Sequence, residues 1–174
     1  NHRHLSEYAD IVVTSCTKYI GGHNDLIGGL IACFNASCID AIWNLRSTLG
    51  SIMPPFSIFL LLRSLRTYDM RINRSLENMS KILAHLSSFP SNIIPSIFYP
   101  GLHSNSSESD VYSKYFSHGG SVVSFLVDSI SDINSRIESF ASIKMAPTFG
   151  SVDSIVEVPL FMSRGGSVPD SYLS

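Results

Sequence analysis

Charged side chains and cysteines are both scarce in this chain of 174 residues. Charged residues make up 15% of the sequence and leave a net charge of −2, so no strongly basic surface is available to bind nucleic acid. The three cysteines, Cys16, Cys33 and Cys38, form no Cys-x-x-Cys pair, which argues against a structural zinc site and against a disulfide framework. We therefore expect no nucleic-acid partner and a reducing, cytoplasmic environment.

Long apolar runs are also absent. The longest strongly apolar run, residues 58–62, is much shorter than the roughly 20 residues that a membrane-spanning helix needs. Residues 1–10 are polar and lack the apolar centre of a secretory leader, and the chain does not begin with methionine. We expect no membrane partner, and we expect the chain to be an internal fragment of a longer protein.

Hydrophobic residues, in contrast, make up 44% of the sequence, which is enough to build a core. The pattern predicts two units that meet near residue 90. In residues 1–90 we expect buried strands at 11–14 and 26–34, a helix at 38–48, and one helix of about 30 residues that begins at Pro54-Pro55 and ends before Pro90. In residues 91–174 we expect an α+β unit with strands at 93–99, 121–127 and 145–149, a short helix that ends at Tyr115 and a helix at 130–140.

Lys18 lies in the most informative stretch of the chain. The stretch Ser15-Cys16-Thr17-Lys18-Tyr19-Ile20-Gly21-Gly22 comes directly after the apolar residues 11–13. A lysine amine condenses with an aldehyde, and neighbouring hydroxyl groups donate to a phosphate, so the pattern is typical of a site for pyridoxal 5′-phosphate. The alternative is a solvated lysine with Ser15 and Thr17 as ordinary turn hydroxyls.

Several separated segments, in order and at near-family spacing, resemble the Cys/Met-metabolism pyridoxal-phosphate enzymes, the transsulfuration group. The matching segments are Ala9-Asp10-Ile11-Val12-Val13, residues 15–25, Leu49-Gly50, Leu62-Arg63-Ser64-Leu65-Arg66-Thr67, Tyr99-Pro100-Gly101-Leu102, residues 119–125 and Ala146-Pro147-Thr148-Phe149-Gly150.

The resemblance implies an α/β fold of fold type I. Residues 1–90 would form the end of the large cofactor-binding domain with a long connecting helix, and residues 91–174 would form most of a smaller α+β C-terminal domain. Lys18 would be the catalytic Schiff-base lysine, Ser15 and Thr17 would bind the cofactor phosphate, and Thr148 would help to bind the substrate carboxylate. The free Lys18 amine would move protons between substrate carbon atoms as general base and acid.

The sequence departs from the family pattern in two places within the matched region. Ser64 replaces the usual glycine after Arg63, and Ser151 replaces the second glycine after Phe149. The second exchange restricts a loop beside the substrate if that position needs a positive φ. The family's partner for the pyridine nitrogen and its arginine for the substrate carboxylate fall outside the sequence. We therefore expect this chain to be inactive alone, with the function residing in the full-length parent, which in this family is a homotetramer built from dimers.

The specific activity is predicted from two segments. Residues 23–25 and 143–150 are most similar to cystathionine γ-synthase, especially the plant type, for which a plastid is the alternative to the cytoplasm. That enzyme replaces the γ-substituent of an activated homoserine with cysteine and so forms cystathionine. Glu157, before Val158-Pro159, is instead similar to the γ-lyases, and a β-lyase is a further alternative.

Two other interpretations remain. A truncated relative could serve as a non-catalytic subunit-contact module. His23 and Asp25 could bind a metal together with His2 and His4, but their spacing matches no standard ligand pattern, so we expect no metal.

Overall fold

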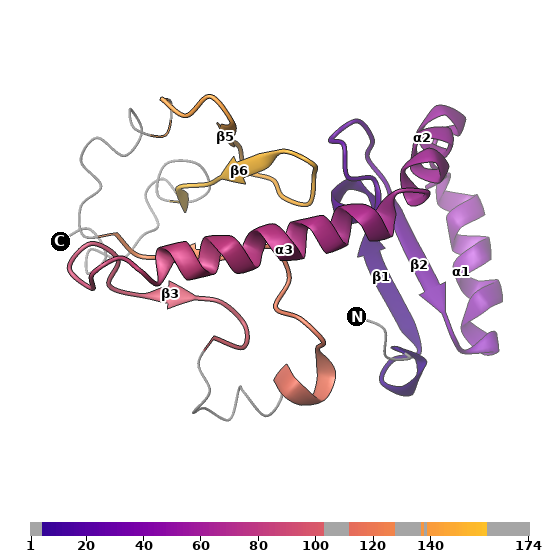
Figure 1. The fold of residues 1–174 in the computed structure, drawn as a ribbon. Helices are drawn as coiled ribbons and strands as arrows, with labels where there is room; N and C mark the ends of the chain where they lie inside the picture. The colour runs from indigo at the N-terminus through magenta and orange to yellow at the C-terminus, as the bar shows by residue number, and fades with distance from the viewer. Residues whose placement is uncertain (1–4, 103–111, 128–136, 138, 160–174) are drawn as a thin grey trace.

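The computed structural model describes residues 5–102, 112–127, 137 and 139–159, and Figure 1 shows its ribbon. In chain order the helices and strands are η1 (Leu5–Glu7), β1 (Ile11–Ser15), η2 (Cys16–Ile20), β2 (Gly29–Cys33), α1 (Ala36–Leu49), α2 (Pro55–Leu65), α3 (Tyr68–Leu86), β3 (Ile97–Phe98), β4 (Ser124–Phe125), β5 (Ile143–Met145) and β6 (Ser154–Val156). In the described part of the chain no helix is both long enough and apolar enough to cross a bilayer.

The N-terminal strands form an antiparallel pair, in which Ile11 of β1 faces Cys33 of β2 and Ser15 faces Gly29. Both strands were predicted from their apolar, β-branched residues, but the prediction that they are buried was wrong. Val13 is 72% exposed. With only two strands in this sheet, its faces have too little packed against them to bury the apolar side chains.

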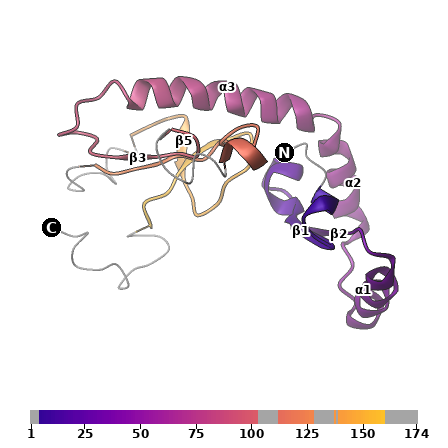
Figure 2. The same cartoon turned by 90° about the horizontal axis from the view of Figure 1, so that it is seen from below.

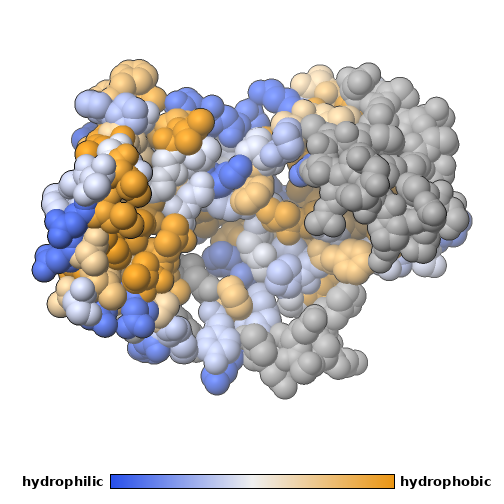
Figure 3. Space-filling view, turned by 180° about the vertical axis from the view of Figure 1, so that it is seen from behind, coloured by the Kyte–Doolittle hydropathy of each residue, from blue (hydrophilic) through white to orange (hydrophobic). Residues whose placement is uncertain are grey.

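Apolar side chains are also exposed on the helices beside this sheet. Figure 3 shows them gathered over the end of the molecule formed by β1, β2, α1 and α2. Trp43 of α1 is 60% exposed and Phe56 of α2 is 71% exposed. The described residues therefore leave much apolar surface uncovered.

The predicted single helix after Pro54-Pro55 was wrong, because α2 and α3 are separate helices. Thr67, between them, has φ −114° and ψ 9°, outside the helical region. The Thr67 hydroxyl donates to the Ser64 carbonyl at 3.2 Å, which satisfies one of the carbonyl groups at the end of α2. The chain therefore turns between the two helices without a glycine or proline.

The long helix α3 runs from the β1–β2 sheet toward the C-terminal strands, and Figure 2 shows it lying along one edge of the molecule. Strands β3 and β4 pair antiparallel, with Ile97 opposite Phe125, whereas β5 and β6 pair parallel, with Ile143 opposite Ser154. These strands are shorter than predicted. A helix forms at residues 112–115, as predicted, whereas most of the helix predicted at 130–140 lies outside the described residues.

The strand predicted at 145–149 is displaced toward the N-terminus, because β5 ends at Met145. Residues 146–150 instead form a loop, in which Gly150 has a φ of +87°. This loop carries Thr148 to Lys18 of η2. The division of the chain at residue 90 stays a prediction.

Candidate active site

Lys18 lies in η2, a single π-helical turn that follows β1 directly. Its own φ of −88° and ψ of −126° are not helical, so the backbone kinks at this residue. The Gly21 amide donates to the Cys16 carbonyl at 2.8 Å, and the Gly22 amide donates to the Lys18 carbonyl at 2.7 Å. These two bonds close the turn around the kink.

The buried side of this turn packs against the residues before β2. Cys16 is completely buried, and its amide donates to the Gly28 carbonyl at 2.9 Å. Burial raises the pKa of the Cys16 thiol. The end of the Met53 side chain occupies the space where a Cβ on Gly28 would lie, so Met53 packs directly against the Gly28 backbone.

The Lys18 amine meets Thr148 from the far end of the sequence. Lys18 Nζ donates to Thr148 Oγ1 at 3.1 Å, although the two residues are 130 positions apart. Nζ also lies 4.9 Å from the centroid of the Phe149 ring, within the range of a cation–π contact. The structure thus brings together two of the predicted site residues, and it adds Phe149, which the sequence analysis had not assigned to the site.

Gly150 packs directly against the backbone of the lysine turn. A Cβ at Gly150 would lie 2.7 Å from the Tyr19 amide nitrogen and 3.0 Å from the Lys18 carbonyl carbon. Among the described residues, Asn24 is the single non-glycine with a positive φ, so Ser151 does not have one. The suspected strain at Ser151 was therefore wrong, because the left-handed residue of this loop is Gly150.

Tyr19 packs against residues from the second half of the chain. Its hydroxyl accepts from Ser121 Oγ at 3.1 Å, and its ring centroid lies 6.0 Å from that of Phe149. The Val152 amide donates to the Gly22 carbonyl at 3.0 Å. Contacts on both sides of Lys18 thus hold the turn against residues 121 and 148–152.

Ser15 and Thr17 flank the buried Cys16, and the structure gives their hydroxyl groups different surroundings. Thr17 Oγ1 accepts from the Gly28 amide at 3.0 Å. The Thr17 hydroxyl donates in turn only to the Gly28 carbonyl, at a long 3.4 Å. The Ser15 side chain is exposed and has no hydrogen-bond partner within the described residues. Neither hydroxyl contacts the Lys18 amine. The two hydroxyl groups and the amine are therefore three separate donors.

This donor set fits pyridoxal 5′-phosphate. One half-buried primary amine can bind its aldehyde, and two hydroxyl groups with weakly engaged or free protons can donate to its phosphate. Ser15 ends β1, and Thr17 and Lys18 lie on the turn that follows it directly, so the three groups come from one short segment.

Arg71 is a site residue that the sequence analysis missed. From the first turn of α3 its guanidinium donates to the Tyr19 carbonyl at 2.8 Å and to the Ile20 carbonyl at 3.1 Å. Burial lowers the pKa of Arg71, with a smaller opposing effect of Tyr68. Both acceptors lie about fifty positions earlier in the chain, so no local pattern in the sequence signals these contacts.

The substituted residue Ser64 lies near the end of α2 and is buried. Its hydroxyl oxygen is 3.4 Å from Nδ1 of His23, and that nitrogen is 2.8 Å from the Gly21 carbonyl, to which it can donate. The serine therefore adds a polar contact to His23 that a glycine would lack. His23 serves the loop structure here, whereas His2 and His4 lie outside the described residues.

Comparison with known proteins identifies the family. A sequence profile described as Cys/Met metabolism PLP-dependent enzyme matches residues 1–171. The chain belongs to this family. Its cofactor is pyridoxal 5′-phosphate, as the lysine turn predicted, and its members include the transsulfuration enzymes.

Three curated relatives of this family have near-equal identity to the chain. Cystathionine gamma-synthase 1 of Arabidopsis thaliana is 35% identical over 94% of this chain and 28% of its own length. Cystathionine beta-lyase of the same plant is 34% identical over 96% of this chain and 35% of its own length. Cystathionine gamma-lyase of Dictyostelium discoideum is 34% identical over 92% of this chain and 41% of its own length. The chain thus spans less than half the length of each.

Solved structures agree with this assignment. The cystathionine gamma synthase of Xanthomonas oryzae pv. oryzae, in complex with aminoacrylate and cysteine, matches with a TM-score of 0.85 and 26% identity over 97% of this chain and 43% of that one. The metB protein of Corynebacterium glutamicum matches with a TM-score of 0.81 and 31% identity over 92% of this chain and 43% of that one. The α/β fold of fold type I predicted from the sequence is confirmed.

Proposed function

We propose that the protein is a cystathionine γ-synthase, which replaces the γ-substituent of an activated homoserine with cysteine. The observation that carries the proposal is the 3.1 Å hydrogen bond from the Lys18 amine to Thr148. It places a reactive amine next to a hydroxyl in the segment 143–150, which is the segment most similar to the synthases. The structures of a relative with cysteine and with cystathionine support amino-acid substrates of this size.

Each residue of the site has a defined task in this proposal. When bound, the cofactor supplies an aldehyde that accepts an amine and a pyridinium ring that accepts electrons. Ser15 and Thr17 bind its phosphate through their hydroxyl protons. The Lys18 amine removes the substrate's α-proton and returns protons at neighbouring carbon atoms, since its Nζ is held at a fixed position. Thr148 Oγ1 holds that amine before substrate enters and then helps to bind the substrate carboxylate.

Cystathionine γ-lyase is the second candidate. Glu157 before Val158-Pro159 favours it, and γ-lyase and β-lyase relatives are almost as similar to the chain as the synthase is. An incubation experiment separates the synthase, the γ-lyase and the β-lyase. The protein, as its gene encodes it, is incubated with cofactor and with either activated homoserine plus cysteine or cystathionine alone. Cystathionine as product supports the synthase. Cysteine with 2-oxobutanoate indicates the γ-lyase, and homocysteine with pyruvate indicates the β-lyase.

The site assignment is tested separately from the substrate. Borohydride reduction after addition of cofactor, followed by peptide mapping, is expected to place one pyridoxyl group on Lys18. The exposed Lys81 serves as the internal control for non-specific reaction. A pyridoxyl group on another lysine, or none, would refute the assignment and favour the non-catalytic subunit-contact module.

Assembly and domain division form the last part of the proposal. We expect a homotetramer built from dimers, with residues 1–90 in the large domain and 91–174 in the smaller C-terminal domain. The exposed apolar side chains of α1 and α2 support an assembly that covers them. Sedimentation equilibrium of the gene-encoded protein tests the tetramer, and a monomer at micromolar concentration would refute it.

A further inference from the structure

The break between α2 and α3 places one guanidinium group against the lysine turn. Within the described residues, Arg71 makes four hydrogen bonds, and every acceptor is an uncharged oxygen atom. Nε donates to Thr67 Oγ1 at 3.2 Å, and Nη2 donates to the Ser64 carbonyl at 3.1 Å. These two bonds fix the side chain to the break itself. A continuous helix over this region would use the Ser64 carbonyl in its own ladder.

The other two acceptors are the carbonyl groups that directly follow Lys18. Nη1 donates to Tyr19 and Nη2 to Ile20, so the planar fork of the guanidinium binds two adjacent peptide groups at once. A lysine ammonium at this position lacks that geometry. Gly22 lies against the same group, because a Cβ on Gly22 would collide with the Arg71 guanidinium, and its φ of +72° also requires glycine.

The kinked backbone of Lys18 needs such support. Its ψ of −126° departs from the helical value inside a turn of only five residues, so the backbone hydrogen bonds of a regular helix do not determine its direction. We propose that Arg71 is the positioning residue of Lys18, which fixes the two peptide groups after the kink and so holds the Lys18 amine at Thr148.

This proposal rests on the proposed function for the chemical role of Lys18, but the position of the amine can be measured with no cofactor present. Loss of the guanidinium frees the Tyr19 and Ile20 carbonyl groups. The turn then relaxes, and the Lys18 amine loses its hydrogen bond to Thr148 and becomes more available to an acylating reagent.

The experiment measures the rate of Lys18 acetylation by acetic anhydride in the full chain, with peptide mapping by mass spectrometry and exposed Lys81 as the internal reference. Arg71→Gln is expected to raise the Lys18 to Lys81 ratio about fivefold, the factor for one lost hydrogen bond. Thr148→Val is expected to raise it by a similar factor. The double variant is expected to react no faster than either single variant, because both changes release the same contact.

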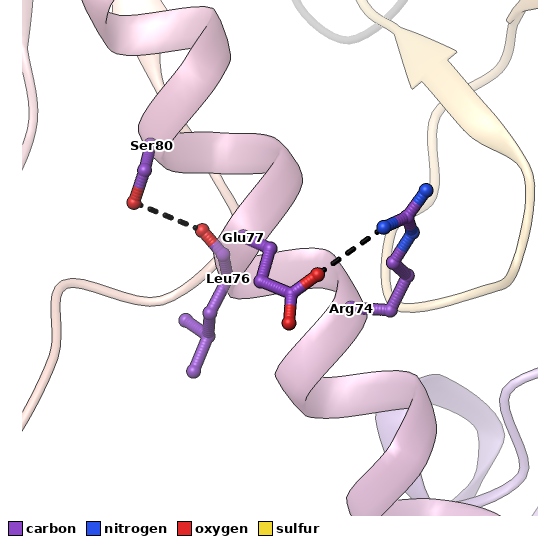
Figure 4. A network of polar contacts seen from close by, with 4 residues as sticks. All are labelled: Arg74, Leu76, Glu77 and Ser80. Carbon is purple, nitrogen blue, oxygen red and sulfur yellow. Dashed lines mark hydrogen bonds and ion pairs between the residues drawn. The ribbon is translucent and has the colours of Figure 1, made fainter.

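The matched control is Arg74→Gln, on the same helix one turn further along. Arg74 is 67% exposed and pairs with Glu77 at 3.2 Å on the surface of α3, as Figure 4 shows. Its loss is expected to leave the Lys18 rate unchanged. An unchanged Lys18 rate in Arg71→Gln would overturn the proposal. The proposal would also be overturned if the effects of Arg71→Gln and Thr148→Val on the Lys18 rate multiplied in the double variant. That result would indicate general loosening of the structure.

Arg71→Lys decides the matter if Arg71→Gln does not fold. It keeps the charge but not the fork, so the Lys18 rate is expected to lie between those of the wild type and Thr148→Val. A wild-type rate in folded Arg71→Lys would overturn the proposal. If borohydride marks no lysine while these rates respond as expected, the proposed function fails and the positioning role of Arg71 stands.

Discussion

Replacement of Gly150 by alanine tests whether the loop 146–150 rests on the lysine turn. Two costs are expected. The φ of +87° imposes about 1–2 kcal/mol on any residue with a Cβ. The new methyl group would also lie 2.7 Å from the Tyr19 amide nitrogen and 3.1 Å from the Lys18 Cβ, and such overpacking costs about 1–3 kcal/mol. The free energy of unfolding is therefore expected to fall by roughly 2–5 kcal/mol.

Gly120→Ala is the matched control for this measurement. Gly120 has a φ of +85°, but nothing lies within 4 Å of the Cβ that alanine would add. Only the backbone cost of about 1–2 kcal/mol applies there. The difference between the two variants therefore isolates the contact with the lysine turn.

Urea unfolding followed by circular dichroism measures both variants, and the acetylation ratio of Lys18 to Lys81 reports the site itself. Gly150→Ala is expected to raise that ratio, because displacement of the loop withdraws Thr148 from the amine, whereas Gly120→Ala leaves it unchanged. Equal losses of stability, together with an unchanged ratio in both variants, would refute the packing described here.

Four further predictions follow from the contacts of Thr17, Cys16 and Asn35. Thr17→Val leaves the Gly28 amide without its acceptor and is expected to cost about 1–2 kcal/mol in urea unfolding, whereas Thr17→Ser keeps the bond; equal losses would contradict this. Burial raises the pKa of Cys16, so alkylation of Cys16 at pH 8 is expected to be at least about tenfold slower than that of Cys38, measured by peptide mapping. The neutral Cys16 thiol contributes its full stabilisation below the pKa that the thiol has in the unfolded protein. This stabilisation is lost as the pH rises through the higher pKa of the folded protein. A free energy of unfolding that stays constant above pH 9 would contradict this. Asn35→Ala removes the side-chain cap of α1 and is expected to cost about 1 kcal/mol, while Asn35→Asp, which can still cap, is expected to cost less.

The sequence predicted well those helices and strands that are determined by residue types and spacings within the element itself. The β-branched run at 11–13 and the apolar spacing of 38–48 correspond to β1 and α1 within a few residues. The glycine at position 21 also follows from a nearby contact, because a Cβ there would lie 2.6 Å from the Cys16 carbonyl oxygen.

The helix break and the exposure of the sheet depend on distant residues, and for that reason local patterns missed them. Apolar spacing continues across Arg66 and Thr67, and neither residue is a strong helix breaker. The break is held by Arg71, whose acceptors Tyr19 and Ile20 lie about fifty positions earlier. Burial of β1 was inferred from side-chain type alone, which cannot show whether a covering element is present.

The candidate site was predictable in part. Lys18, Ser15 and Thr17 followed from a local pattern, and Thr148 entered only through the family resemblance. No pattern in the sequence states that Lys18 and Thr148 touch. Phe149 and Arg71 were missed because their contacts join the lysine turn to a distant loop and to the start of another helix.

The long separation between Lys18 and Thr148 has a consequence for biosynthesis. The lysine leaves the ribosome 130 residues before its threonine partner, so the nascent chain carries an unsheltered amine during that interval. At bacterial or eukaryotic elongation speeds of about 5–20 residues per second, that interval lasts on the order of ten seconds. Ribosomes stalled before the codon for Thr148 would expose this amine to cellular aldehydes, whereas completed and folded chains would not.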